Sequence, residues 1–201
     1  IAESQGDMTQ VKGDSIFPVL NMLNTKYFIL PLEGGQTVPV QNPYAYGNAW
    51  IIDKVTYVDN ANAELARVGK IDLRHEAVAD KRFKAVLGDS KKQDGESIVK
   101  LTSYAPNRLT YDVSTTKGGV IVFAENYYPG WTALVDGKEV EIGRVNYVLR
   151  AISVTAGRHK VELSFFPKTV NTTEYIAYAA YVVILLAILL LVFLYFRKKE
   201  S

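Results

Sequence analysis

The chain has 201 residues, of which 22% are charged, and its formal net charge at pH 7 is +2. A charge balance this close to neutral gives no electrostatic reason to expect a nucleic-acid partner. Because the sequence contains no cysteine, disulfides, thiolate metal sites and a cysteine nucleophile are excluded.

Residues 1–14 are polar and are predicted to be a mobile lead-in to the folded domain. A short helix is expected next, capped by Asp14 or Ser15, with Pro18 in its first turn and its end near Asn24. The apolar face of this helix is predicted to consist of Phe17, Leu20 and Leu23.

Strands and breakers alternate through the middle of the chain. Residues 31–47 contain three prolines and the Gly34-Gly35 pair, so they are predicted to form a loop. A helix is predicted over residues 61–68 with Asn60 as its N-cap, and the very polar segment 81–95 is predicted to be an exposed loop. The predicted strands of this part are residues 27–30, 50–58 and 72–79.

Strand signals become stronger after residue 96. Residues 97–104 and 109–113 are predicted strands, and residues 120–125 are apolar on both faces, which is typical of a central strand. Asp136-Gly137 is a strong signal for a two-residue hairpin turn. The turn predicts three facing pairs on the core side of this hairpin, Val135 with Lys138, Ala133 with Val140 and Trp131 with Ile142. Its other side, which carries Thr132, Leu134, Glu139 and Glu141, is predicted to face water.

A second hairpin is predicted from residues 148–154 and 160–166, joined through Ala156-Gly157. Its inward side chains would be His159, Val161, Leu163 and Phe165. Together these elements predict a mainly β protein, with an antiparallel, jelly-roll-like β-sandwich and one or two short helices over residues 15–167.

Motifs for catalysis, metal binding or cofactor binding are not recognised in the sequence. His75 and His159 lie far apart along the chain and are predicted to be structural. The spacings typical of zinc proteases, nucleophile elbows, Walker loops and calcium loops do not occur. No catalytic residue, metal ligand or cofactor is therefore predicted.

The segment from Glu125 to Trp131 is the densest group of candidate ligand-binding residues. Its composition suits a sugar, because aromatic rings stack on sugar faces while Asn and Glu bind hydroxyls. The alternative is structural, since Pro129-Gly130 resembles a simple turn and the hairpin register places Trp131 in the core. The candidate ligand-binding residues are Tyr127, Tyr128, Glu125 and Asn126, with Asn146 and Arg150 nearby.

Residues 176–196 form an apolar run without charge, Pro or Gly. A helix of this length is about 31 Å long, which matches the hydrocarbon core of a bilayer, so a transmembrane helix is predicted. Residues 168–175 are predicted to be a juxtamembrane linker. Residues 197–201 form a basic tail that is predicted to stay in the cytoplasm, which would place the β domain outside it.

The sequence begins at Ile1 with a polar stretch that lacks the apolar region of a signal peptide. We therefore expect the chain to be the C-terminal part of something longer, either a processed secreted protein or the end of a multi-span membrane protein.

Several short blocks, in a fixed order and spacing, resemble the C-terminal region of bacterial YfhO-like membrane proteins. These blocks are residues 20–27, 47–50, 125–131, 135–138, 144–151 and 156–160. The resemblance implies a polytopic protein of the bacterial cytoplasmic membrane, similar to GT-C glycosyltransferases that use polyprenyl-phosphate sugars to modify envelope polymers such as lipoteichoic acid. The catalytic acids of GT-C enzymes belong to an early extracytoplasmic loop outside this chain, so no catalytic residue is carried over.

The resemblance also implies the partners of the chain: membrane lipid, the protein's own upstream transmembrane helices, and an envelope glycan or polyprenyl-linked sugar. We expect a non-catalytic accessory domain of a membrane glycosyltransferase. The alternative is a membrane-anchored sandwich that binds carbohydrate or protein and has no enzymatic role.

Overall fold

The computed structural model of the chain describes residues 17–89 and 97–200. The chain divides into two units, with the boundary between Phe165 and Phe166. The predicted lead-in of residues 1–14 and the predicted cap Ser15 lie outside the described residues.

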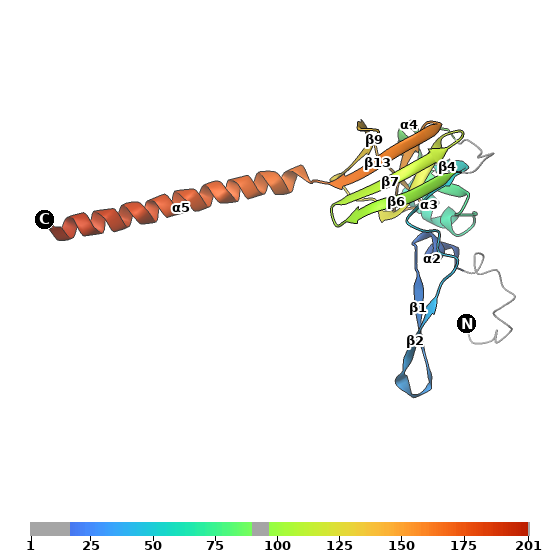
Figure 1. The fold of residues 1–201 in the computed structure, drawn as a ribbon, viewed down its shortest axis with the longest axis horizontal. Coiled ribbons are helices and arrows are strands. Elements are labelled where there is room, and N and C mark those ends of the chain that lie inside the picture. Colours follow the sequence, from blue (N-terminus) through green and yellow to red (C-terminus); the bar gives the residue numbers. More distant parts are fainter. Residues whose placement is uncertain (1–16, 90–96, 201) are drawn as a thin grey trace. The chain divides into compact units, whose positions relative to one another are not determined.

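A five-stranded antiparallel sheet forms one side of a β-sandwich in the first unit, with the strand order β10-β9-β13-β7-β6 (Figure 1). The register predicted for the Asp136-Gly137 hairpin is confirmed, because Val135 faces Lys138 and Ala133 faces Val140. The third predicted pair is absent from the ladder, since β10 ends at Val140. The strands are β6 (Ile98–Ala105), β7 (Arg108–Thr115), β9 (Trp131–Val135), β10 (Lys138–Val140) and β13 (Gly157–Phe165).

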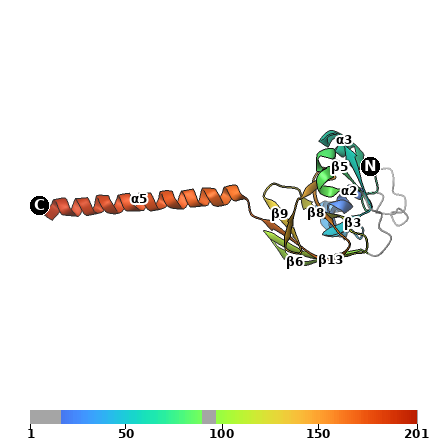
Figure 2. The ribbon, with the colours of Figure 1, turned by 90° about the horizontal axis from the view of Figure 1, so that it is seen from above.

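A four-stranded antiparallel sheet with the order β11-β12-β8-β3 lies opposite the first sheet (Figure 2). Its central strand β8 is buried on both faces, as predicted for residues 120–125: Ile121 and Phe123 pack between the two sheets, while Val122 packs on the other side. The strands are β3 (Ala49–Ile52), β8 (Gly119–Asn126), β11 (Gly143–Val145) and β12 (Leu149–Val154).

A third layer covers the outer face of the four-stranded sheet. It contains a parallel pair, β4 (Lys54–Val58) and β5 (Glu76–Asp80), connected through α3 (Ala61–Val68). The predicted N-cap of α3 is confirmed, because Oδ1 of Asn60 accepts a hydrogen bond from the Ala63 N–H at 3.0 Å. The predicted strand 50–58 is in fact two strands in different sheets, β3 and β4, separated at Asp53.

The prediction of an exposed loop over residues 81–95 is wrong for its first part. The chain forms η2 (Lys81–Phe83) and α4 (Lys84–Leu87) there. Phe83 and Leu87 are buried in the core between the third layer and the four-stranded sheet. Two apolar side chains at this spacing anchor the segment despite its polar composition.

The predicted second hairpin is also wrong. Strand β12 pairs with β11 and β8 in the four-stranded sheet, whereas β13 pairs with β7 and β9 in the five-stranded sheet. Nearly every residue of β12 is buried, while the burial of β13 alternates along much of its length. The burial of each strand therefore matches its sheet. Strand β12 is covered on both faces and belongs to the four-stranded sheet, whereas β13 is covered on one face and belongs to the five-stranded sheet. The inward positions of Val161 and Leu163 were predicted correctly, since both are buried.

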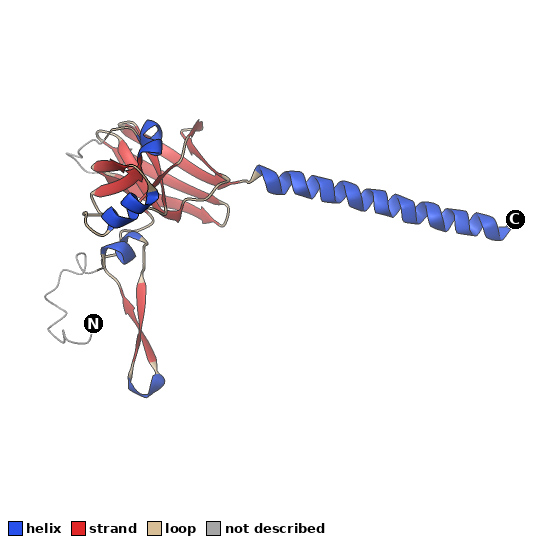
Figure 3. Ribbon diagram, turned by 180° about the vertical axis from the view of Figure 1, so that it is seen from behind, coloured by secondary structure: helices blue, strands red, loops and turns tan. Residues whose placement is uncertain are grey.

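The N-terminal part contains a hairpin that the sequence did not predict. Strand β1 (Tyr27–Pro31) pairs with β2 (Thr37–Gln41) around η1 (Glu33–Gly35), forming a separate twisted ribbon (Figure 3). The prediction of a loop over residues 31–47 is therefore wrong as far as Gln41, whereas residues 42–47 form a loop as predicted. Pro39 is tolerated inside β2 because a two-stranded ribbon has only edge strands.

The predicted N-terminal helix is α2 (Pro18–Met22), and Phe17 rather than an upstream residue is its N-cap. Its buried residues are Asn21 and Met22, so the predicted apolar face is wrong. The residues of that face, Phe17, Leu20 and Leu23, are exposed. Helix α2 is too short for apolar spacing to decide which side packs against its neighbours.

The second unit contains one helix, α5 (Lys168–Glu200). Residues 172–198 form a helix that is long and apolar enough to cross a membrane, and an 18-residue window within it has a mean hydropathy of 2.9. The residues predicted as a linker therefore belong to the same helix as the predicted span. The predicted fold class is confirmed: the protein is mainly β, with antiparallel sheets, a few short helices and one C-terminal apolar helix.

Candidate binding cleft

A cleft of about 770 Å³ lies where η2 and α4 meet the loop after β8 and the end of the β9–β10 hairpin. It brings together three segments that are far apart in sequence. Its lining consists of Arg82, Phe83, Val86, the continuous run from Tyr127 to Thr132, and the run from Glu139 to Ile142.

Four aromatic side chains line this cleft, and their packing holds most of them in place. The rings of Phe83 and Tyr127 meet edge to face with their centroids 5.7 Å apart. Phe165 supports two others, with its centroid 5.4 Å from that of Trp131 and 6.1 Å from that of Tyr128. Tyr128 remains 63% exposed. The cleft therefore presents apolar ring surface to a ligand.

Trp131 lies over a buried cation. The guanidinium carbon of Arg150 is 3.8 Å from the Trp131 ring centroid, and Arg150 is only 2% exposed. Its Nη2 donates to Oε2 of Glu125 at 3.3 Å. Nε and Nη1 have no hydrogen-bond partner among the described residues. A desolvated cation–π contact of this kind contributes about 2 kcal/mol, so Arg150 fixes the orientation of a ring in the cleft wall.

Burial lowers the pKa of Arg150, and the Glu125 carboxylate opposes that shift. Arginine nevertheless keeps its charge in proteins. Tyr111 lies in the same inter-sheet layer, where burial is the main cause that raises the pKa of its phenol and the Glu125 carboxylate adds to it. The buried guanidinium of Arg150 thus lies near the partly exposed carboxylate of Glu125 and the neutral phenol of Tyr111.

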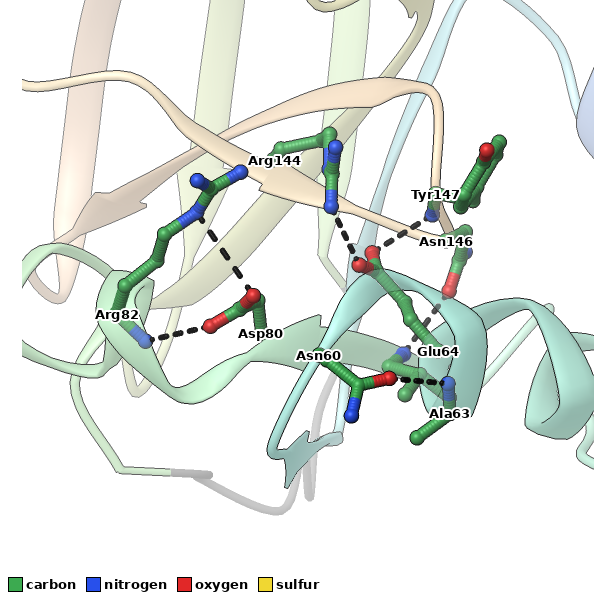
Figure 4. Close-up of polar contacts among 9 residues, drawn as sticks. Asn60, Ala63, Glu64, Asp80, Arg82, Arg144, Asn146 and Tyr147 are labelled. Carbon is green, nitrogen blue, oxygen red and sulfur yellow. Dashed lines mark hydrogen bonds and ion pairs between the residues drawn. The ribbon is translucent and has the colours of Figure 1, made fainter.

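The charged residues that line the cleft itself differ in how they are paired. Arg82 lies beside Asp80, with Nε 3.9 Å from Oδ2, and its guanidinium carbon is 4.7 Å from the Phe83 ring centroid (Figure 4). Glu139 and Glu141 are exposed, and within the described residues their carboxylates make no hydrogen bond or ion pair. The unpaired charge of the cleft is therefore negative.

A buried polar network joins α3 to β11 and to the turn that follows it (Figure 4). Glu64 of α3 is fully buried; its Oε2 accepts from Nη2 of Arg144 at 2.8 Å and its Oε1 accepts from the Tyr147 N–H at 2.7 Å. The guanidinium of Arg144 also lies 6.0 Å from the Phe83 ring centroid. The network thereby ties the turn between β11 and β12 to α3 and to an aromatic residue of the cleft.

The same turn contains two consecutive residues in the left-handed region, Asn146 with φ 50° and Tyr147 with φ 72°. Such conformations are unfavourable for residues other than glycine and persist where surrounding contacts impose them. Here Asn146 exchanges two hydrogen bonds with the backbone of Val78, at 2.7 and 2.9 Å. Asn146 is therefore bound to the protein's own backbone by its side-chain oxygen.

The structure brings only two of the predicted ligand-binding residues, Tyr127 and Tyr128, to the cleft lining. Glu125 and Arg150 lie behind Trp131, and Asn146 belongs to the buried network. Asn126 ends β8 and does not line the cleft. Whether any of the six binds a ligand stays a prediction.

Sequence reasoning missed Arg82, Phe83, Glu139 and Glu141 as cleft residues. The hairpin register predicts that both glutamates lie on the water-facing side, which is a signal for accessible carboxylates. It does not indicate that they lie close to the aromatic loop. Arg82 and Phe83 come from a segment that was predicted to be an exposed loop. Among the described residues, no group of three or more His, Asp or Glu side chains is placed to hold a metal ion.

The fold defines a class: a β-sandwich domain followed by a helix that is long and apolar enough to cross a bilayer. The family described as bacterial membrane protein YfhO matches residues 73–177, which is more than half of the chain. The chain therefore belongs to the YfhO family of bacterial membrane proteins. No curated protein and no solved structure matches it.

The family match confirms the resemblance predicted from the sequence. Four of the six blocks that carried the resemblance lie inside the matched residues, whereas residues 20–27 and 47–50 lie before them. Family membership and the candidate span together fit a membrane location.

Proposed function

We propose that this chain is the extracytoplasmic C-terminal domain and last membrane span of a polytopic membrane protein. Family membership and the apolar helix support the membrane location. The charge distribution supports the orientation: Arg197, Lys198 and Lys199 follow the apolar run 176–196, whereas residues 171–174 before it contain no Lys or Arg. Basic residues stay preferentially on the cytoplasmic side of a membrane helix.

The parent protein, on this proposal, transfers a sugar from a polyprenyl-phosphate donor to an envelope polymer. The β domain is an accessory part that contacts the acceptor glycan without performing the chemistry. The observation that carries this role is the cleft, whose four aromatic residues and two free carboxylates offer stacking surfaces and hydroxyl acceptors together. Its volume falls in the range of about 300 to 1,000 Å³ that is usual for ligand sites.

The β1–β2 hairpin is the part of the domain that we assign to contact with the protein's own upstream transmembrane helices and the surrounding lipid. Tyr27, Ile29 and Leu32 are between 50% and 71% exposed. Neither strand of the hairpin contains a charged residue. Apolar surface of this kind is typical of an interaction site with a protein or a membrane.

A sugar-transfer assay with membranes that contain the whole parent protein tests the proposal. Tyr128→Ala removes an exposed ring from the cleft and is expected to reduce transfer to the polymer roughly fivefold at limiting acceptor, mainly through KM, since stacking contacts are worth about 1 kcal/mol. Tyr104→Ala is the matched control, because Tyr104 is 68% exposed on β6 and lies outside the cleft.

Equal transfer by the two variants would contradict the proposed role of the cleft in binding the acceptor.

The alternative function, a membrane-anchored sandwich that binds carbohydrate or protein without enzymatic activity, is favoured by the same cleft. It predicts that glycan binds while no sugar is transferred by the wild-type protein from any donor of a broad panel.

A further inference from the structure

The charged side chains that line the cleft determine whether it favours a cationic, a neutral or an anionic glycan. Among the described residues that line the cleft, three have side chains that are charged at neutral pH: Arg82, Glu139 and Glu141. The positive charge of Arg82 is partly offset by Asp80, whose Oδ2 lies 3.9 Å from the Arg82 Nε. The other oxygen of Asp80, Oδ1, accepts from the Arg82 backbone N–H at 3.0 Å. The guanidinium is further occupied by stacking on Phe83.

Glu139 and Glu141 supply the uncompensated charge. They lie two positions apart at the end of the β9–β10 hairpin, and both line the cleft. Within the described residues neither carboxylate has an ion-pair or hydrogen-bond partner. A phosphate or carboxylate group of an anionic polymer would therefore meet repulsion in this cleft, whereas a cation would gain two acceptors.

The aromatic residues act in the same direction as the carboxylates. The face of an aromatic ring carries partial negative charge and attracts ammonium groups, most strongly for Trp and Tyr. Tyr127, Tyr128 and Trp131 line the cleft together with the two glutamates. Trp131 already carries a cation, Arg150, 3.8 Å from its ring centroid, so Tyr127 and Tyr128 are the rings left to a ligand.

We propose that the cleft binds a glycan whose sugar unit carries a protonated amine. The ammonium group lies at Glu139 and Glu141, and the sugar ring stacks on the tyrosines of the loop. This inference rests on the proposed function, because it names the chemical class of the glycan that the accessory domain binds.

Calorimetric titration of the full chain in detergent micelles tests the inference with two matched probes, a glucosamine tetrasaccharide and its N-acetylated form. The two share one backbone and differ in the charge of the amine, which is protonated at about pH 6. We expect the amine form to bind about tenfold more tightly, because charge-assisted hydrogen bonds and cation–π contacts form with the protonated amine and not with the N-acetyl group. The preference should weaken as salt is added.

Glu139→Gln combined with Glu141→Gln should abolish the preference and leave binding of the N-acetylated probe unchanged. Glu33→Gln, at the tip of the β1–β2 hairpin, makes the same type of charge change outside the cleft and should keep the preference. The substitutions are at exposed positions, and circular dichroism of each variant verifies that it is folded.

Three outcomes would overturn the inference. Equal affinity for the two sugar probes would make the cleft a site for neutral sugars. Tighter binding of poly(glycerol phosphate), which contains no sugar, would make it a site for anionic polymers. Both results leave the proposed role of the cleft in acceptor binding intact. Failure of all three probes to bind would reject the glycan-binding role as well.

Discussion

At Trp131 one side chain serves two purposes that sequence reasoning treated as alternatives. The ring packs against the inter-sheet core and Phe165, as the hairpin register predicted, and it also lines the cleft. Arg150 makes the two roles compatible, because a buried guanidinium holds the ring in one orientation. The register of a hairpin specifies on which face of the sheet a side chain lies. It does not indicate which other segments lie next to the end of the strand.

Asp136 forms a polar cluster on the far side of the same hairpin. Its Oδ2 lies 2.7 Å from Nδ1 of His159, and its Oδ1 accepts from the Lys160 N–H at 2.8 Å. The hydrogen bond from His159, followed by that from Lys160, holds the pKa of Asp136 below its ordinary value of 3.8. Because the folded state favours the ionised form, this contribution to stability is fully present above pH 3.8 and is lost as the pH falls through the lower pKa of the folded protein.

Asp136→Asn is therefore expected to reduce the acid sensitivity of the domain. Asn keeps the positive φ of 51° that the turn requires, so the change removes the titrating group and preserves the hairpin. The measurement is the difference in melting temperature between about pH 6 and about pH 2, which should be smaller for the variant. Asp112→Asn, at an exposed position of β7, is the control. Equal differences in the variant and the wild type would contradict the assignment.

At the scale of elements, Glu64 connects α3 to β11 and to the turn that follows it. The carboxylate is fully buried and is bonded by both Arg144 and the Tyr147 backbone. Removing one partner of a buried ion pair leaves the other charge without compensation, which costs about 3 to 5 kcal/mol. The paired substitution of both residues avoids that penalty.

Glu64→Gln and Arg144→Met are each expected to lower the free energy of unfolding by about 3 kcal/mol, and the double variant by clearly less than the sum. Denaturant unfolding of the four proteins gives the interaction energy as a double-mutant cycle. Strict additivity would show that the pair is not coupled.

Because Arg144 also lies near Phe83, glycan binding should weaken in the Arg144→Met variant.

Helices, strands and turns were predicted correctly from the sequence where a local sequence pattern is sufficient to specify the element. The Asp136-Gly137 hairpin, the N-cap at Asn60 and the two-sided strand β8 were predicted correctly, because a turn dipeptide, a capping side chain and an apolar run act within a few residues. The partner of β12 was not, because Ala156-Gly157 is equally compatible with a hairpin and with a crossover between sheets. Burial on both faces decides that question, and burial is a property of the whole fold.

At the scale of the whole molecule, the orientation in the membrane has a direct test. The chain has no native cysteine, so single cysteines introduced by Ser103→Cys in the β domain and by Glu200→Cys after the span are specific labelling sites. A membrane-impermeant maleimide applied to intact cells should label the first and reach the second only after the cells are permeabilised. The reverse pattern would place the β domain in the cytoplasm and exclude an extracytoplasmic role.

The sequence by itself determined the apolar helix, the β-rich class, the family and the aromatic loop that contributes Tyr127 and Tyr128 to the cleft. The helix, the strands and the loop follow from residues that are close together along the chain, and the family follows from the order and spacing of short blocks. The tertiary structure alone decided that Phe83, Tyr128 and Glu139 line one cleft and that Arg150 lies beneath Trp131. Those contacts join segments separated by tens of residues, and they depend on which strands share a sheet and which faces are covered.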